Sequence, residues 1–134
     1  MKTLVLANQK GGVGKSAVAT LLTHYLAQHG QRVLAIDLDH QGNFSKPLRL
    51  SQRPAVAACT ADALLIGPVA CLPHQPLVLV PSGAGLLGLE RQPTLHTPFA
   101  RNFRTFLASV DSQFDVIVPK ADVKLLLGQR CSCR

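Results

Sequence analysis

The chain has 134 residues, the size of one domain, and hydrophobic residues make up 47% of it. Its aromatic content of 4% predicts a core of leucine, valine, alanine and isoleucine, and its formal charge of +7 is compatible with nucleic acid or an acidic membrane surface. No signal-peptide pattern and no apolar run of the roughly 18 residues that a bilayer needs is present, so we expect a cytoplasmic chain with reduced thiols.

The first predicted elements are a short apolar strand over residues 3–7, a glycine-rich loop and a helix. The loop and helix start contain Lys10, Gly11, Gly12, Val13, Gly14, Lys15, Ser16 and Ala17. A strand–loop–helix context of this kind predicts a phosphate-binding loop, because glycines let backbone N–H groups turn toward phosphate oxygens. Lys15 would then contact the β- and γ-phosphates, and the Ser16 hydroxyl would ligate Mg²⁺.

The helix after the loop carries apolar residues at helical spacing. This stripe, which we expect to face the core, consists of Val18, Leu21, Leu22, Tyr25 and Leu26. Gly30 suits the position just past the helix end. A second strand over residues 33–36 completes a right-handed β-α-β unit.

Two carboxylates follow this second strand. Asp37 and Asp39 are expected at the carboxyl end of the strand, at the same sheet edge as the phosphate loop. Residues 44–76 are less readable, and within them Lys46, Arg49 and Arg53, among Pro47 and Pro54, resemble a solvated connection.

The later elements are a helix, a strand, a helix and a last strand. We expect a short helix over residues 61–66 capped by Thr60 and ended by Gly67, and a strand over residues 77–80. A second helical stripe contains Phe99, Phe103, Phe106, Leu107 and Val110. A strand over residues 115–118 should end at Pro119, since proline cannot donate a hydrogen bond.

Three segments carry a family resemblance. Residues 10–16 resemble the deviant Walker A motif of the ParA/MinD/Soj group of P-loop ATPases, in which Lys10 matches the second lysine and Gln9 stands at the usual first glycine. Residues 37–43 resemble the switch segment of partition ParA proteins, and residues 77–90 resemble a later strand–proline–helix segment. The resemblance implies a three-layer α/β P-loop NTPase fold with a mainly parallel, incomplete sheet. Residues 1–118 would form the family part, and residues 119–134 a truncated or frame-shifted tail.

The resemblance also implies roles and partners. Lys10, Lys15 and Asp39 would be catalytic, residues 11–17 would hold ATP, and Ser16 with Asp37, through water, would hold Mg²⁺. The implied function is a partition ATPase that drives plasmid or chromosome segregation. It would form an ATP-dependent homodimer, bind DNA non-specifically and respond to a ParB-like partner, with nucleoid association when bound to DNA and no stable membrane insertion.

One position departs from the family pattern. Lys120 stands where the family places the Walker B aspartate, and Asp122 comes two residues later. Hydrolysis by this chain is therefore left open. The alternatives are a fragment that binds nucleotide without turnover and a MinD-like regulator at a membrane surface. His40 stands at the family's proline position and is expected to be a loop residue without a role; Cys131 and Cys133 are too few for a metal site.

Overall fold

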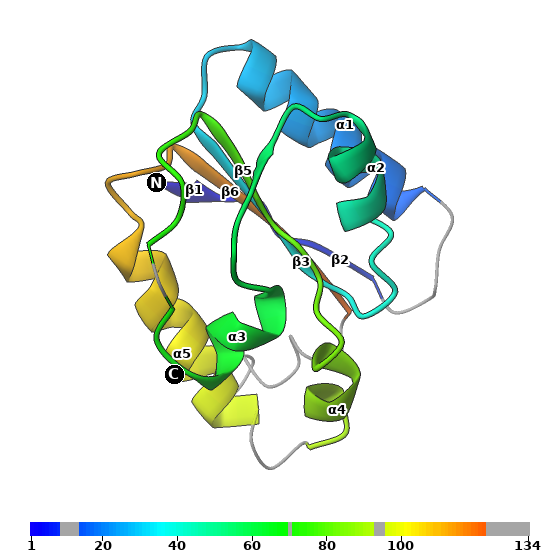
Figure 1. Cartoon of the computed structure of the whole chain (residues 1–134), viewed down its shortest axis with the longest axis vertical. Helices are drawn as coiled ribbons and strands as arrows, with labels where there is room; N and C mark the ends of the chain where they lie inside the picture. Colours follow the sequence, from blue (N-terminus) through cyan, green and yellow to red (C-terminus); the bar gives the residue numbers. More distant parts are fainter. Residues whose placement is uncertain (9–13, 70, 93–95, 123–134) are drawn as a thin grey trace.

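The computed structural model describes residues 1–8, 14–69, 71–92 and 96–122. Within them one parallel sheet contains β1 (Lys2–Thr3), β2 (Leu6–Asn8), β3 (Val33–Leu38), β4 (Ala55–Val56), β5 (Leu77–Val80) and β6 (Val116–Asp122). The strand order is β1-β6-β3-β5-β4, and β2 pairs with β6 beyond β1. Strands β3 and β6 therefore lie side by side at the centre (Figure 1).

Helices cover both faces of this sheet, as Figure 1 shows. They are α1 (Lys15–Gln28), α2 (Ser45–Leu50), α3 (Ala61–Ile66), α4 (Leu86–Glu90) and α5 (His96–Ser109). One core cluster joins the sheet to α3, α4 and α5, and a second joins the other face to α1 and α2. The predicted three-layer α/β fold with a parallel sheet is confirmed.

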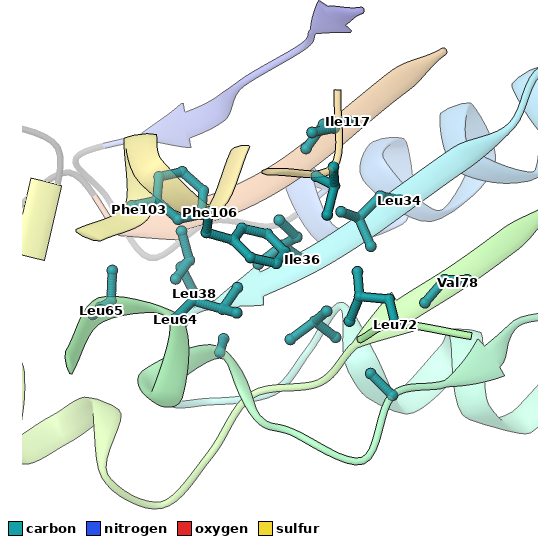
Figure 2. Packing of buried hydrophobic residues seen from close by; sticks show 14 of the residues in the cluster. Leu34, Ile36, Leu38, Leu64, Leu65, Leu72, Val78, Phe103, Phe106 and Ile117 are labelled. Carbon is teal, nitrogen blue, oxygen red and sulfur yellow. The ribbon is translucent and has the colours of Figure 1, made fainter. Parts of the chain in front are cut away.

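The central strand shows which side chains face which layer. Every residue of β3 is buried. Leu34 and Ile36 belong to the cluster under α3 and α5 (Figure 2), whereas Val33 and Ala35 pack on the α1 side. Because side chains alternate along a strand, Asp37 continues the row that faces α1. The same alternation in β6 places Lys120 in the row of Val116 and Val118 on that face.

The sequence predicts the wrong buried face for α1, because several residues of the apolar stripe are exposed. Val18, Leu21 and Tyr25 are 54%, 70% and 57% exposed, while Ala19 and Thr23 are fully buried. Small residues at the contact let the helix axis approach the sheet closely. The Thr23 hydroxyl donates to the Ala19 carbonyl at 2.7 Å, so its polar group is satisfied inside the helix.

The N-terminal strand and the last strand also differ from expectation. The strand predicted over residues 3–7 is split into β1 and β2, and β6 continues through Pro119 to Asp122. Leu4 N–H donates to the Ile117 carbonyl at 2.9 Å, so Ile117, and Pro119 two residues later, face β1 and β2. The backbone nitrogen of Pro119, which carries no hydrogen, therefore faces the break between β1 and β2, where no hydrogen bond is needed. The ladder with β3 is uninterrupted from Val116 to Ala121.

The remaining elements are close to those predicted. Helix α3, its Thr60 cap position and strand β5 have the expected bounds, although Thr60 makes no side-chain capping bond, and Gly30 has the positive φ of 80° expected past a helix end. Helix α5 carries the expected phenylalanine face. Lys46, Arg49 and Arg53 are exposed, as the expected solvated connection requires, but Phe44 and Leu48 are fully buried and pack α2 against the sheet.

Candidate functional site

The start of α1 lies one short loop after β2, as the phosphate-loop prediction requires. Lys10, Gly11, Gly12 and Val13 lie outside the described residues. Gly14 precedes the helix with φ 103° and ψ −18°, a left-handed conformation that favours glycine, and its carbonyl accepts the Val18 N–H at 2.8 Å. Lys15, Ser16 and Ala17 form the first turn, so the positive dipole end of α1 lies at the carboxyl edge of the sheet.

Asp37 lies at this edge and is completely buried. Its Oδ2 accepts the Ser45 N–H at 2.8 Å and the Ser45 hydroxyl at 2.7 Å, and its Oδ1 accepts the Asp39 N–H at 3.2 Å. The Ser82 N–H donates to Ser45 Oγ at 3.0 Å, so Ser45 ties the end of β3 to the segment after β5. Burial raises the pKa of Asp37, and the hydrogen bonds from Ser45 and Asp39 and the charge of Lys120 offset part of that rise.

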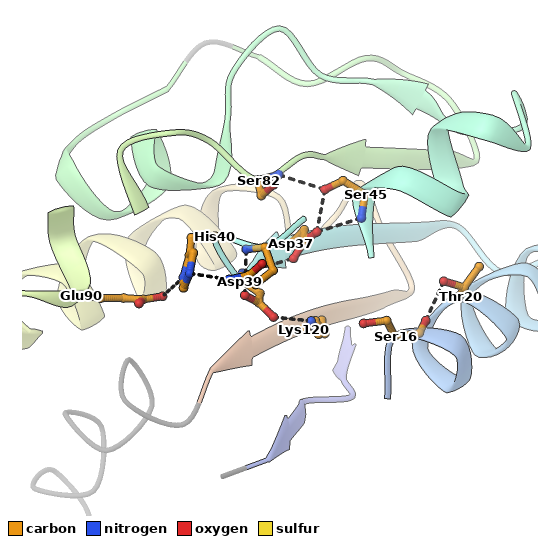
Figure 3. Close-up of polar contacts among 10 residues, drawn as sticks. Ser16, Thr20, Asp37, Asp39, His40, Ser45, Ser82, Glu90 and Lys120 are labelled. Carbon is orange, nitrogen blue, oxygen red and sulfur yellow. Dashed lines mark hydrogen bonds and ion pairs between the residues drawn. The ribbon is translucent and has the colours of Figure 1, made fainter. Parts of the chain in front are cut away.

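Asp39 is paired with Lys120. The Lys120 ammonium donates to Asp39 Oδ2 at 2.5 Å, and the two side chains are 6% and 17% exposed (Figure 3). Asp37 and Lys120 are direct neighbours in the β3–β6 register, so the lysine extends along the sheet edge past Asp37 to reach Asp39. Partial burial pushes the pKa of Asp39 upward. The hydrogen bonds from Lys120 and the Gln41 N–H, with the charges of Lys120 and His40, outweigh it and hold this pKa below its ordinary value.

His40 has a partner that the sequence did not indicate. Its Nδ1 lies 3.2 Å from Oε1 of Glu90, at the end of α4, and its Nε2 lies 2.9 Å from Gln41 Nε2. Only 7% of the Glu90 side chain is exposed. The pair joins the segment after β3 to α4 (Figure 3), and the expectation of a loop histidine without a functional role stays a prediction.

The carboxylates at this edge do not fit a magnesium ion as they are arranged here. Both Asp37 oxygens already accept hydrogen bonds, and Asp39 Oδ2 is occupied by an ammonium, which is a donor and not a metal ligand. No group of three or more histidine, cysteine, aspartate or glutamate side chains that could hold a metal occurs in the described part of the chain. The roles of Ser16 and Asp37 at Mg²⁺ stay predictions.

Sequence reasoning missed Ser45, Ser82 and the partner of Lys120. Ser45 and Ser82 belong to no motif, and only the packing of α2 and β5 beside β3 brings them to Asp37. Lys120 departs from the family pattern in the sequence, but its pairing with Asp39 depends on the β3–β6 register, for which the sequence carries no signal.

Comparison with known proteins places these features in a family. The model of the family described as AAA domain matches residues 1–124. The chromosome-partitioning ATPase Soj of Treponema pallidum is 35% identical over 118 residues, which cover 87% of this chain and 47% of that protein. The chromosome partitioning protein ParA of Caulobacter vibrioides is 38% identical over 94 residues, covering 67% of this chain and 35% of the relative.

A solved structure shares the fold. Cobyrinic acid a,c-diamide synthase from Mycobacterium smegmatis, with bound ATP analog and magnesium, superposes with a TM-score of 0.70 at 27% identity, covering 95% of this chain and 55% of that one. The chain thus spans about half the length, or less, of these relatives. None of the helices described here is long and apolar enough to cross a bilayer.

Proposed function

Because the chain belongs to the AAA domain family, among its P-loop ATPases of the ParA/MinD type, we propose that it binds ATP at the edge formed by α1 and the ends of β3 and β6. The observation that carries this proposal is the placement of the α1 N-terminus, after a strand and a glycine-rich loop, at the sheet edge that holds Asp37 and Asp39. Ligands of open parallel sheets bind at this edge.

The residues have distinct proposed roles. Backbone N–H groups of residues 11–17 would surround the phosphates, and Lys15 and Lys10 would add positive charge. Asp39 would orient the attacking water. With Oδ2 bound to Lys120 and Oδ1 accepting the Gln41 N–H, Asp39 is held away from that task, so we propose nucleotide binding with hydrolysis at background.

The cellular role that we propose is partition of a plasmid or chromosome. The support is the sequence similarity to proteins named Soj and ParA, because the synthase shows that the same fold also serves a different reaction. An ATP-dependent homodimer, non-specific DNA and a ParB-like protein are the proposed partners, and the charge of +7 favours the DNA contact.

Replacing Lys15 by alanine tests the nucleotide site. We expect Lys15→Ala to lose binding of a fluorescent ATP analogue by at least about tenfold, since the variant lacks a charge on the phosphates. Its circular dichroism spectrum should be unchanged. Lys2→Ala, which removes an exposed lysine from β1, is the matched control and should bind like the wild type. Equal affinity in all three proteins would contradict the proposed phosphate-binding site. Mg²⁺-dependent phosphate release by the wild type that is lost in Lys15→Ala would contradict the proposal that hydrolysis is at background.

A further inference from the structure

A fixed positive charge already lies at the carboxyl edge of the sheet. The Lys120 ammonium is 2.5 Å from Asp39 Oδ2, its side chain is 6% exposed, and its strand neighbour on β3 is the buried Asp37. Helix α1 packs against β6, so this ammonium shares a face of the sheet with the helix start. The lysine is held by the β6 backbone, which is paired on both sides.

We propose that Lys120 takes the place of the divalent cation, so that this chain binds a nucleoside triphosphate in its metal-free form. The inference rests on the proposed nucleotide site and deepens it by naming the form of the ligand. It parts from the synthase of similar fold, whose solved structure holds an ATP analog together with magnesium.

The charges at this edge support the substitution. Both oxygens of Asp37 and both oxygens of Asp39 already accept hydrogen bonds, and the Lys120 ammonium is one of the donors to Asp39. A divalent ion would have to displace these donors, the Lys120 ammonium among them, before either carboxylate could act as a ligand. A metal-free triphosphate needs positive charge instead, and Lys120 would provide it together with the lysines of the phosphate loop.

The alternative is that Lys120 only fills a structural position. A purely structural ion pair would leave the metal requirement of nucleotide binding unchanged. The two readings therefore differ in a binding measurement that needs no catalysis.

The test is the affinity for a fluorescent ATP analogue in Mg²⁺ and in EDTA, for the full chain and for variants at position 120. We expect the wild type to bind with dissociation constants within about threefold in the two buffers, because its cation is part of the protein. Lys120→Asp should bind at least about tenfold more weakly in EDTA than in Mg²⁺, because three carboxylates then need a metal.

Matched variants separate charge from folding. Lys120→Arg keeps the positive charge and should keep metal-independent binding, and Lys2→Asp makes the same charge change at an exposed site on β1 and should behave as the wild type. Thermal melting checks that each variant is folded, and the wild type alone decides the proposal if Lys120→Asp does not fold.

The outcomes are distinguishable. Wild-type binding that is lost in EDTA would overturn the metal-free ligand and leave the proposed nucleotide site standing. Binding in neither buffer, with Lys15→Ala indistinguishable from the wild type, would overturn both. A Lys120→Asp variant that is also indifferent to Mg²⁺ would show that Lys120 does not determine the metal requirement.

Discussion

At the carboxyl edge of the sheet, the pKa of a carboxylate depends on its burial and its hydrogen-bond partners more than on its residue type. Asp37 and Asp39 are two residues apart and both acidic, yet burial raises the pKa of the first while Lys120 and Gln41 help to hold that of the second below its ordinary value. A buried ion pair is costly to break from one side, at about 3–5 kcal/mol, because the remaining charge is left without a partner. Asp39 and Lys120 are therefore coupled, and a change at either residue acts on both.

At the opposite edge of the sheet, we expect Asp115 to make a contribution to folding stability that depends on pH. Hydrogen bonds from the Arg32 side chain and the Arg32 N–H lower the pKa of Asp115 from 3.8 to about 2. Because the folded-state pKa is depressed, the stabilisation is complete above the unfolded value and is lost as the pH falls through the folded one. We expect Asp115→Asn to be less stable than the wild type above about pH 4, and the difference to disappear as the pH falls below about 2.

Urea unfolding at a series of pH values measures this difference. Asp111→Asn, which removes an exposed carboxylate that lies 3.6 Å from the N-terminal ammonium and does not contact Arg32, controls for the change in net charge. A stability gap between Asp115→Asn and the wild type that stays constant down to the lowest pH would show that the Arg32 pair is not the cause.

At the scale of elements, α1 shows how a helix can be recognised while its buried face is not. The chain places apolar residues nearly all round this helix, so a hydrophobic stripe fits more than one orientation. The orientation adopted buries Ala19 and Thr23, which allow close packing on β3 and β6, and leaves Leu21 70% exposed.

This orientation predicts that substitutions on the two faces of α1 change folding stability to very different extents. Ala19→Leu should destabilise the fold by about 1–3 kcal/mol, because added methyl groups have no space between helix and sheet. Leu21→Lys, a larger chemical change, should stay within about 0.5 kcal/mol of the wild type because the side chain is in solvent. Chemical denaturation midpoints measure both, and a Leu21→Lys variant as unstable as Ala19→Leu would restore the stripe predicted from the sequence.

Strand β6 extends further along the chain than its sequence predicts. Pro119 was expected to end the strand, but its nitrogen faces the break between β1 and β2, so no ladder bond with β3 is lost. The strand therefore carries Lys120 to the level of Asp37. Without that continuation, the ammonium would not reach Asp39.

For the whole molecule, the net charge of +7 determines what we expect of DNA. Association should be indifferent to sequence and weaken steeply as salt rises, because it depends on counterion release. This charge is present with and without ATP, so association should be measurable in both states. Fluorescence anisotropy of a labelled duplex at several salt concentrations, with and without ATP, measures this. Tight binding that requires ATP would instead support an ATP-dependent dimer of this chain.

The sequence by itself determined the order and type of most elements and the edge where the site would lie. The glycine run before a helix, the unbroken apolar strands and the two aspartates after residue 36 are local patterns, and local backbone preference is enough to place them. The family resemblance rested on the same local segments, and the match over residues 1–124 confirms the family.

Only the tertiary structure decided which side chains meet. The pairing of Lys120 with Asp39, of Ser45 with Asp37 and of His40 with Glu90 joins residues 81, 8 and 50 positions apart. The rotation of α1 likewise depended on close packing against β3 and β6. These contacts follow from strand register and helix–sheet packing, which bring distant residues together and leave no periodic trace in the chain.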